Sequence, residues 1–325
     1  MSYLSDKSTL YLFSKKYRLE LKNKKLYIYL EEEKIDEIPF FRLTGLVLNY
    51  HIPISAKILQ YTFTHNITVC FVDGNFRFVG SVRHPESKNI FLRKAQYRTV
   101  DDAQKSLGIT KEIVKAKITN QAKVIHLRQT EFALQIDAIE EADNIDSIRG
   151  VEGAFANMYW KKFGEGIKAA EFSWKGRNKY PARDEVNALL SWGYTLLGIE
   201  LQTFQEIVGL DPYLGVYHRD YYGRPSLVCD MQEEFRAWVV DAFVLKLLNL
   251  RIIRKEHFKE QNGEMRLKGE GYQIFMSRWL DHIKKDKKNY LGFKEPISIR
   301  SVIEYQVRMM SKDMLNEKKF KGYIV

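Results

Sequence analysis

The residues best suited to chemistry lie between positions 209 and 241, in GLDPYLGVYHRDYYGRPSLVCDMQEEFRAWVVD. This stretch contains one histidine, His218, and a cluster of three acids, Asp230, Glu233 and Glu234, within largely apolar sequence. One imidazole together with carboxylates suits a divalent ion such as Mg²⁺ or Mn²⁺ with open positions for water or phosphate oxygens, whereas zinc more often takes cysteine or several histidines. The residue mix therefore predicts a metal site that needs a further ligand from elsewhere in the chain.

Turns and a helix must position these groups. Gly209 can end the helix before them, and turns at 211–212 and 223–225 allow a new helix to begin near Ser226, a candidate N-cap. The three acids would then lie at i, i+3 and i+4 in the first turns of that helix, where like charges crowd together. Because the positive end of the helix dipole favours acids there, ordinary first-turn acids without a chemical role are the alternative.

Another acid, Glu152, precedes aromatic residues on the same face of a predicted helix. In SIRGVEGAFANMYWKKFG, Glu152 shares a helical face with Ala156, Tyr159 and Phe163, and small residues around it would let a ligand or another backbone approach. The alternative is a structural carboxylate paired with Arg149 or with a neighbouring lysine.

Basic and aromatic residues alternate in FSWKGRNKYPARD, at positions 172–184. Its cations include Lys175, Arg177 and Arg183, a combination that suits phosphate contact and base stacking on a single-stranded or frayed DNA end. A solvated loop anchored by Trp174 is the alternative.

Two arginines flank the start of the acidic helix. Arg224 and Arg236 could hold phosphate oxygens there, because arginine recognises phosphate through paired hydrogen bonds. The alternative for Arg236 is an ion pair with Glu233 or Glu234.

Composition narrows the class of protein. The 325 residues are 45% hydrophobic and 13% aromatic, enough for one large or two smaller packed domains. A net charge of +11 favours a polyanionic partner such as nucleic acid, although an acidic protein would also fit. Cys70 and Cys229 have no spacing typical of a metal knuckle or redox pair. Without a bilayer-length apolar run, we expect a soluble, cytoplasmic protein that uses no membrane.

The first part of the chain has the period of β-strands. From Thr9 to Val82 apolar residues mostly alternate with polar ones. Hairpin turns are expected at 23–25 and 73–75, and a short helix at 53–66.

From Asn89 on, apolar spacings of three and four residues predict helices almost throughout, one of them with Asp184 as N-cap. We therefore predict an α+β fold. A small β-rich N-terminal domain at 1–88 would precede a larger, all-helical C-terminal domain at 89–325 that carries the chemistry.

Four blocks of the chain, RGVEGAFANMYW, DEVNALLSWGYTLL, GLDPYLGVYH and GRPSLVCDMQEEFR, resemble in order and spacing the signature blocks of the CRISPR-associated integrase family, Cas-one. The resemblance extends over essentially the whole chain. It implies that Glu152, His218 and Glu233 are the metal ligands and that Asp230 is an alternate ligand or supports one. The chain departs from the pattern at Tyr217 and at NKYPARD, and neither departure is expected to touch a proposed ligand.

The same resemblance implies a DNA nuclease that captures new spacers and inserts them into a CRISPR array. With Mg²⁺ or Mn²⁺ bound, a 3′-hydroxyl of the incoming double-stranded DNA would attack a phosphodiester of the repeat. A homodimer formed through the β-rich domain, and a small Cas-two partner that bridges two dimers, are implied as well. The residues expected to contact DNA are Arg149, Lys175, Arg177, Arg183, Arg224 and Arg236.

Two other functions use the same residues. A nuclease that hydrolyses branched or nicked DNA would need the same metal site with water as nucleophile. A noncatalytic DNA-binding scaffold would need the acids to be structural.

Overall fold

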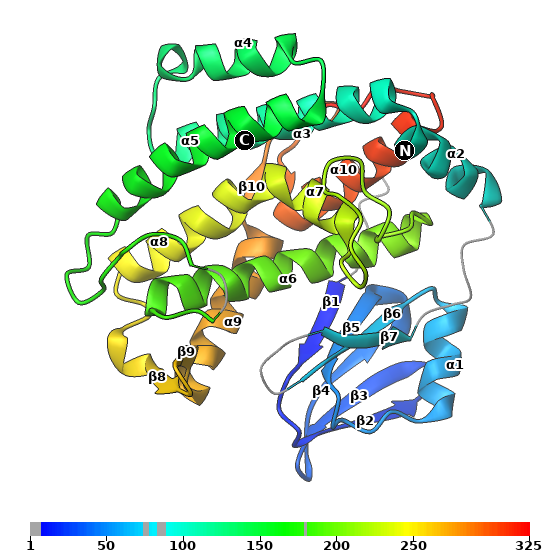
Figure 1. The fold of residues 1–325 in the computed structure, drawn as a ribbon. Helices are drawn as coiled ribbons and strands as arrows, with labels where there is room; N and C mark the ends of the chain where they lie inside the picture. Colours follow the sequence, from blue (N-terminus) through cyan, green and yellow to red (C-terminus); the bar gives the residue numbers. More distant parts are fainter. Residues whose placement is uncertain (1–7, 74–77, 83–88, 179–180) are drawn as a thin grey trace. The chain divides into compact units, whose positions relative to one another are not determined.

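The computed structural model describes residues 8–73, 78–82, 89–178 and 181–325, and the structural statements below concern those residues. The chain divides into two compact units (Figure 1). The first comprises residues up to Ile90 together with Thr203–Leu210, and the second comprises Phe91–Gln202 and Asp211–Val325. Strands dominate the first unit and helices the second, so the predicted α+β class is confirmed.

The first unit contains two sheets. In the larger sheet, β1 pairs in parallel with β5 and β5 in parallel with β6, and β7 runs antiparallel to β6. Its strands are β1 (Ser8–Leu12), β5 (Leu43–Asn49), β6 (Thr68–Val72) and β7 (Phe78–Val82). The smaller, antiparallel sheet consists of β2 (Tyr17–Lys22), β3 (Lys25–Leu30) and β4 (Glu33–Pro39). Helix α1 (Ala56–Thr64), the short helix that the sequence predicts at 53–66, connects the parallel strands β5 and β6.

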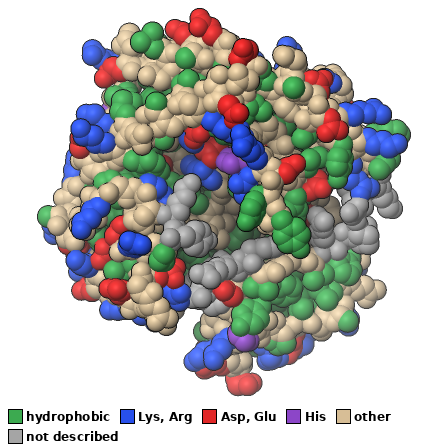
Figure 2. Space-filling view, viewed as in Figure 1, with side chains coloured by type: hydrophobic (Ala, Val, Ile, Leu, Met, Phe, Trp, Pro, Cys, Tyr) green, Lys and Arg blue, Asp and Glu red, His purple; other side chains and the backbone are tan. Residues whose placement is uncertain are grey.

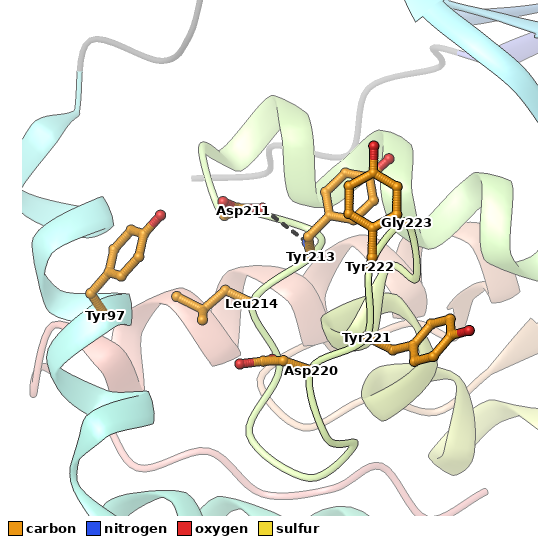
Figure 3. Close-up of a pocket in the computed structure, with 8 residues that line it drawn as sticks. All are labelled: Tyr97, Asp211, Tyr213, Leu214, Asp220, Tyr221, Tyr222 and Gly223. Atoms are coloured by element: carbon orange, nitrogen blue, oxygen red, sulfur yellow. Dashed lines mark hydrogen bonds between the residues drawn. The ribbon is translucent and has the colours of Figure 1, made fainter.

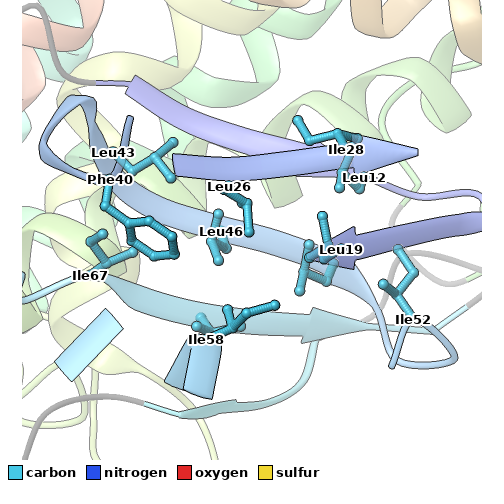
Figure 4. Packing of buried hydrophobic residues seen from close by; sticks show 12 residues of the cluster. Leu12, Leu19, Leu26, Ile28, Phe40, Leu43, Leu46, Ile52, Ile58 and Ile67 are labelled. Carbon is cyan, nitrogen blue, oxygen red and sulfur yellow. The ribbon is translucent and has the colours of Figure 1, made fainter. Parts of the chain in front are cut away.

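Buried side chains from both sheets and from α1 form the core of the first unit (Figure 4). Leu26 and Ile28 on β3 and Leu46 on β5 are buried, and Phe40 packs into the same cluster together with Ile58 of α1. Burying such a side chain contributes about 1.5–3 kcal/mol, which explains why the period of two along β3 fixes the face that this strand turns inward. Strand β5 is buried at almost every position.

The turns of this unit follow from residue type. Asn23 and Lys24 have positive φ angles of 49° and 59° and join Lys22 to Lys25, as a two-residue hairpin requires, so the predicted turn at 23–25 is confirmed. The turn predicted at 73–75 lies partly outside the described residues. The sequence does not predict strand β4, because EKIDEIP is too polar to show a strand period.

The second unit is built mainly from helices. They are α2 (Ile90–Asp101), α3 (Ala103–Val124), α4 (Ala133–Glu141), α5 (Ile145–Glu165), α6 (Glu185–Val208), α7 (Ser226–Phe235), α8 (Ala242–Asn249), α9 (Gly269–Lys285) and α10 (Ile299–Met314). A π-helical segment, Arg236–Asp241, joins α7 to α8. Helix α3 packs against α5, α7 and this π segment, and these four elements carry most of the site described below.

The prediction of an all-helical C-terminal domain is wrong in detail. Two short antiparallel pairs interrupt the helices: β8 (Phe258–Gln261) with β9 (Glu264–Leu267), and β10 (Lys287–Lys288) with β11 (Ile297–Ser298). Asn262 and Gly263, with φ angles of 54° and 72°, form the turn between β8 and β9. This Asn-Gly pair is the sequence signal for a tight hairpin that the helical interpretation overlooked.

Two helix boundaries agree with the sequence. Asp184 accepts a hydrogen bond from the Asn187 backbone N–H at 2.7 Å, so it caps α6 as predicted. Gly209, with a φ angle of 96°, follows the last residue of α6, where a left-handed residue ends a helix. No helix in the described part of the chain is long and apolar enough to cross a membrane.

Candidate metal and DNA site

Helix α7 begins one residue earlier than the cap prediction requires. Ser226 is its first helical residue, and the N-cap is Pro225, whose carbonyl accepts the first helical hydrogen bond from Cys229 at 3.0 Å. The prediction of Ser226 as N-cap is therefore wrong. The preceding loop is fixed by the Leu227 backbone N–H, which donates to the Pro212 carbonyl at 3.0 Å.

Asp230 holds the loop that carries His218. Its Oδ2 accepts from the backbone N–H groups of Val216 at 2.6 Å and Tyr217 at 3.1 Å, and its Oδ1 accepts from the backbone N–H of His218 at 2.9 Å. The loop approaches so closely that a Cβ on Gly215 would lie 2.5 Å from Asp230 Oδ2. A glycine is therefore needed at position 215.

The same carboxylate orients the imidazole. Asp230 Oδ1 lies 2.7 Å from His218 Nδ1, and His218 Nε2 faces Glu233, with 3.9 Å between Nε2 and Glu233 Oε1. Because both oxygens of the fully buried Asp230 already take hydrogen bonds, the geometry favours a supporting role over direct ligation.

The three acids of α7 do not crowd together, contrary to the sequence expectation. Asp230 faces the His218 loop, whereas Glu233 forms ion pairs with Arg236 and with Lys117 of α3, the latter at 2.5 Å. Glu234 accepts from the Gln306 side chain at 2.8 Å and from a backbone N–H of the C-terminal segment at 2.7 Å. Successive helix positions direct each carboxylate to a different neighbour.

Opposite surroundings give the two adjacent glutamates opposite pKa shifts. Burial disfavours ionisation of Glu233, but the charges of Arg236 and Lys117 outweigh it and lower its pKa to about 2. Burial raises the pKa of Glu234 to about 8, against the hydrogen bonds that it accepts. Of these two adjacent glutamates, only Glu233 has the ionised carboxylate that a metal requires at neutral pH.

Glu152 reaches the same place from α5. It pairs with the ammonium group of Lys117, and the Tyr217 hydroxyl donates to its Oε2 at 2.6 Å. The expectation that Tyr217, a departure from the family pattern, touches no proposed ligand is therefore wrong. Burial and the Glu152 charge raise the pKa of the Tyr217 hydroxyl, which keeps it a hydrogen-bond donor.

Arg149 does not pair with Glu152. It forms an ion pair with Asp146 at 2.6 Å and donates to the backbone carbonyl of Tyr217 at 2.5 Å. The partner of Glu152 is a lysine, as the sequence left open, but Lys117 lies 35 residues earlier and on another helix. No local pattern marks Lys117 as a site residue.

Lys117 occupies the space between the two glutamates. The residue is 8% exposed, and burial acts against its charge, but Glu233 and Glu152 outweigh burial and raise its pKa. The described residues contain no group of three His, Cys, Asp or Glu side chains already arranged around a metal position. Instead, an ammonium group separates two of the three predicted ligands.

The donor set nevertheless fits a divalent ion. Two carboxylates and one imidazole nitrogen converge from α5, α7 and the His218 loop, the mixture that Mg²⁺ and Mn²⁺ accept. Glu233 Oε2 is buried and, although it lies 2.5 Å from Lys117 Nζ, it accepts no well-aligned hydrogen bond. The ion would be held by three atoms, Glu233 Oε2, Glu152 Oε1 and His218 Nε2.

Another buried acid, Asp241, lies at the end of the π segment. Asp241 accepts hydrogen bonds from the hydroxyls of Tyr159 at 2.6 Å and Tyr194 at 2.5 Å. Burial raises its pKa to about 7, and the two hydrogen bonds act in the opposite direction. The Arg236 guanidinium lies 5.3 Å from the centre of the Tyr194 ring, so the tyrosine supports the arginine that pairs with Glu233.

The cations predicted to contact DNA differ in accessibility. Lys175 and Arg183 are exposed, whereas Arg177 donates to Asn187 at 2.7 Å and to Ser191 at 3.2 Å and so ties its loop to α6. Arg236 forms the ion pair that was the alternative to a phosphate contact. On one face of the molecule, Lys and Arg side chains lie beside a histidine where the surface is hollowed (Figure 2).

Arg224 is half-buried. It donates to the Arg219 carbonyl, and its guanidinium lies 6.0 Å from the centre of the Tyr221 ring.

A hollow of about 400 Å³ lies between α2 and the loop after α6 (Figure 3). It is lined by Tyr97, Asp211, Tyr213, Leu214, Asp220, Tyr221, Tyr222 and Gly223. The Tyr213 backbone N–H donates to Asp211 at 2.9 Å and shapes the turn. Because four of the lining residues are tyrosines, two are aspartates and none among the described residues is a lysine or arginine, the hollow suits an uncharged ring better than a phosphate. The sequence does not predict this hollow, and its one local signal is the Tyr221-Tyr222 pair close to His218.

Sequence comparison places the chain among known proteins. The profile of the family described as CRISPR associated protein Cas1 matches residues 10–281. A CRISPR-associated endonuclease Cas1 from Moorella thermoacetica is 32% identical over 274 residues, which cover 79% of this chain and 80% of that protein. One from Thermodesulfovibrio yellowstonii is 30% identical over 302 residues, which cover 88% and 94%.

Solved structures share the fold. A CAS1 protein from Thermotoga maritima matches with a TM-score of 0.83 and 24% identity, over 98% of this chain and all of that one. A casposase bound to integration product matches with a TM-score of 0.82 and 23% identity, over 97% and 93%. A chain of a Cas6-RT-Cas1–Cas2 complex matches at 0.80 and 18%, over 99% of this chain and 37% of that one.

Proposed function

Because the chain belongs to the Cas1 family of CRISPR-associated proteins, we propose that it is a metal-dependent DNA endonuclease and integrase that inserts new spacer DNA into a CRISPR array. The observation that carries this proposal is the convergence of Glu152, His218 and Glu233 from three separate elements. Two of these groups are carboxylates held beside cations, and the third is an imidazole held by a buried acid.

Each proposed metal ligand is held in position by a different neighbouring residue of the chain. A bound Mg²⁺ or Mn²⁺ would stabilise negative charge on the phosphodiester oxygens. Asp230 orients His218 through Nδ1 and leaves Nε2 directed at the site. Tyr217 holds Glu152 through Oε2, and Arg236 holds Glu233 through Oε1. Each proposed ligand is thereby held in place before DNA binds. Less entropy is then lost when the reacting groups are brought into position.

The nucleophile in this proposal is a DNA 3′-hydroxyl. In-line attack on a target phosphodiester forms one phosphodiester bond and breaks another, so no ATP is needed. The exposed Lys175 and Arg183, with the net charge of +11, would bind the duplex backbone. Stacking of an unpaired base on the tyrosines of the hollow beside α2 would suit a frayed DNA end.

We extend the proposal to partners by family membership. The chain would act in the cytoplasm as a homodimer formed through its β-rich unit and with a small Cas2 partner. Support comes from a similar fold in a Cas6-RT-Cas1–Cas2 complex. Size measurement by light scattering, with and without the partner, tests this assembly; a stable monomer would contradict it.

The second candidate is a hydrolase that uses water at the same metal site, which is favoured by the description of the relatives as endonucleases. A joining assay separates the two. The protein, with the Cas2 partner and Mn²⁺, is given a repeat-bearing plasmid and short duplexes that end in 3′-hydroxyl or 3′-deoxy. Joining of the hydroxyl duplex alone is expected. Joining of both duplexes, or target hydrolysis as the only product, would contradict the integrase.

Glu152→Ala tests the noncatalytic scaffold in the same assay. An integrase should lose metal-dependent joining while DNA binding persists. A scaffold has no metal-dependent product to lose.

A further inference from the structure

Lys117 is the one cation that touches both predicted carboxylate ligands among the contacts of the described residues. Its ammonium group pairs with Glu152 of α5 and lies 2.5 Å from Glu233 Oε2 of α7, while Lys117 itself belongs to α3. One positive charge therefore bridges two helices at the oxygens that would bind the ion.

The geometry points to a specific role: Lys117 is an internal cation that occupies the metal position of the metal-free protein and is displaced when the divalent ion binds. This inference rests on the proposed function, because it takes Glu152 and Glu233 as metal ligands.

Burial makes such a cation necessary. The Lys117 side chain is 9% exposed and that of Glu233 3% exposed, so neither charge can be compensated by water. Two carboxylates facing each other without a cation would repel, and uncompensated buried charge strongly destabilises a fold. The bridging ammonium, together with Arg236 beside Glu233, offsets that repulsion and keeps the two acids close together when no metal is bound.

Geometry also makes the ammonium and the metal mutually exclusive. Mg²⁺ binds oxygen at about 2.0–2.1 Å, so an ion that takes both Glu152 Oε1 and Glu233 Oε2 lies where the ammonium now lies. Two positive charges within a few ångströms repel strongly at a site with little water. Metal binding therefore competes with the Lys117 charge, and the competition sets the metal concentration at which the site fills.

Lys115 provides a matched control. It lies two residues away on α3 and also pairs with two glutamates, Glu112 at 2.5 Å and Glu140. Glu140 is about half exposed, so water screens that cluster, and neither Glu112 nor Glu140 is a proposed ligand. Removing the charge of Lys115 changes a similar ion-pair pattern without changing the metal site.

The test is calorimetric titration of the full chain with Mn²⁺ in the absence of DNA. Lys117→Met, which keeps length and removes charge, should bind Mn²⁺ at least about tenfold more tightly than wild type, because the competing cation is gone. It should also melt at a lower temperature without metal and show a larger Mn²⁺-induced rise in Tm. Lys115→Met should match wild type in Mn²⁺ affinity.

Lys117→Arg keeps the charge and adds a fork that holds both carboxylates, so it should bind Mn²⁺ more weakly than wild type. If Lys117→Met does not fold, Lys117→Arg alone decides the test. Mn²⁺ binding by Lys117→Arg that equals or exceeds the wild-type affinity contradicts the inference. Unchanged or weaker binding by a folded Lys117→Met also contradicts it. If neither wild type nor a folded Lys117→Met binds Mn²⁺, the proposed metal site fails as well, which distinguishes that failure from the failure of the inference alone.

Discussion

Glu233 and Glu234 are neighbours on α7 and both are buried, yet they differ in charge at neutral pH. Burial opposes ionisation of Glu233, but Arg236 and Lys117 outweigh it and hold its pKa at about 2. Burial without a cation raises the pKa of Glu234 to about 8. Asp241, at the end of the π segment, resembles Glu234, because burial raises its pKa as well, to about 7.

The comparison separates two kinds of buried acid. Glu233 has cations from α3 and from the π segment as partners, while Asp241 has two tyrosine hydroxyls and Glu234 has an amide and a backbone N–H. Burial alone therefore does not make a ligand. The charges of Arg177 and Arg236 also lower the pKa of Asp241 but do not outweigh its burial, whereas the direct ion pairs of Glu233 keep that carboxylate ionised. An ionised carboxylate is the form that binds a metal.

The largest loss of activity is expected when the charge of Glu233 is removed. Glu233→Gln keeps the shape of the side chain but removes the charge, and should lower metal-dependent joining by at least about 100-fold. The neighbouring Glu234→Gln should stay within about threefold of wild type, because Glu234 is not one of the proposed ligands. Initial rates with saturating Mn²⁺ measure both, and equal losses would contradict the distinction.

A smaller loss is expected from the acid that supports the histidine. Asp230→Asn removes the charge that fixes His218 Nδ1 and weakens the acceptor for three backbone N–H groups. Mn²⁺ affinity should fall by about 10- to 100-fold while the protein stays folded. Calorimetric titration measures it. An affinity equal to that of wild type would show that the loop holds His218 without Asp230.

The raised pKa of Asp241 should make the free energy of unfolding depend on pH. Its pKa rises from 3.8 in the unfolded chain to about 7 in the folded protein, so the unfolded chain releases this proton first. Ionisation of Asp241 therefore lowers the free energy of unfolding as pH rises from about 4 to about 7, by on the order of 2–4 kcal/mol.

Asp241→Asn cannot ionise and should lack this part of the decline. Urea unfolding at pH 5, 6 and 7.5 compares it with wild type. Parallel pH profiles for the two proteins would show that the pKa of Asp241 is not raised by folding.

The smallest effects concern the cations of the loop before α6. Lys175→Ala and Arg183→Ala should each lower the salt dependence of duplex binding by about one unit of slope, since both side chains are exposed. Arg177→Ala should instead lower the free energy of unfolding by about 1–3 kcal/mol, because Asn187 and Ser191 each lose a hydrogen-bond donor. Salt titrations and urea unfolding distinguish the two outcomes.

Periodicity and turn chemistry made part of the fold predictable from the sequence. The β-rich start, the hairpin at Asn23-Lys24 and the helix cap at Asp184 follow from local residue types and are confirmed. The polar strand β4 and the Asn262-Gly263 hairpin were missed, the first because it lacks an apolar period and the second because helices were expected around it.

The site was harder to predict, because its contacts join distant parts of the chain. Nothing in the sequence around Lys117 distinguishes it from Lys115, yet packing of α3 against α5 and α7 buries only Lys117 between two acids. Likewise, Arg177 has the sequence context of a phosphate-binding residue, and only the fold turns it toward α6. Residue type indicates possible chemistry, and tertiary packing decides which side chains are available for it.

The most direct test of the metal site is pulsed electron paramagnetic resonance of bound Mn²⁺, which detects nitrogen coordinated to the ion. His282 is the matched control: its Nδ1 also lies 2.7 Å from a carboxylate, but its Nε2 is already 2.9 Å from the Val239 carbonyl. Wild type and His282→Gln should both show coupling to one imidazole nitrogen, and His218→Gln should lose it. Absence of nitrogen coupling in wild type, or its persistence in His218→Gln, would contradict ligation by His218.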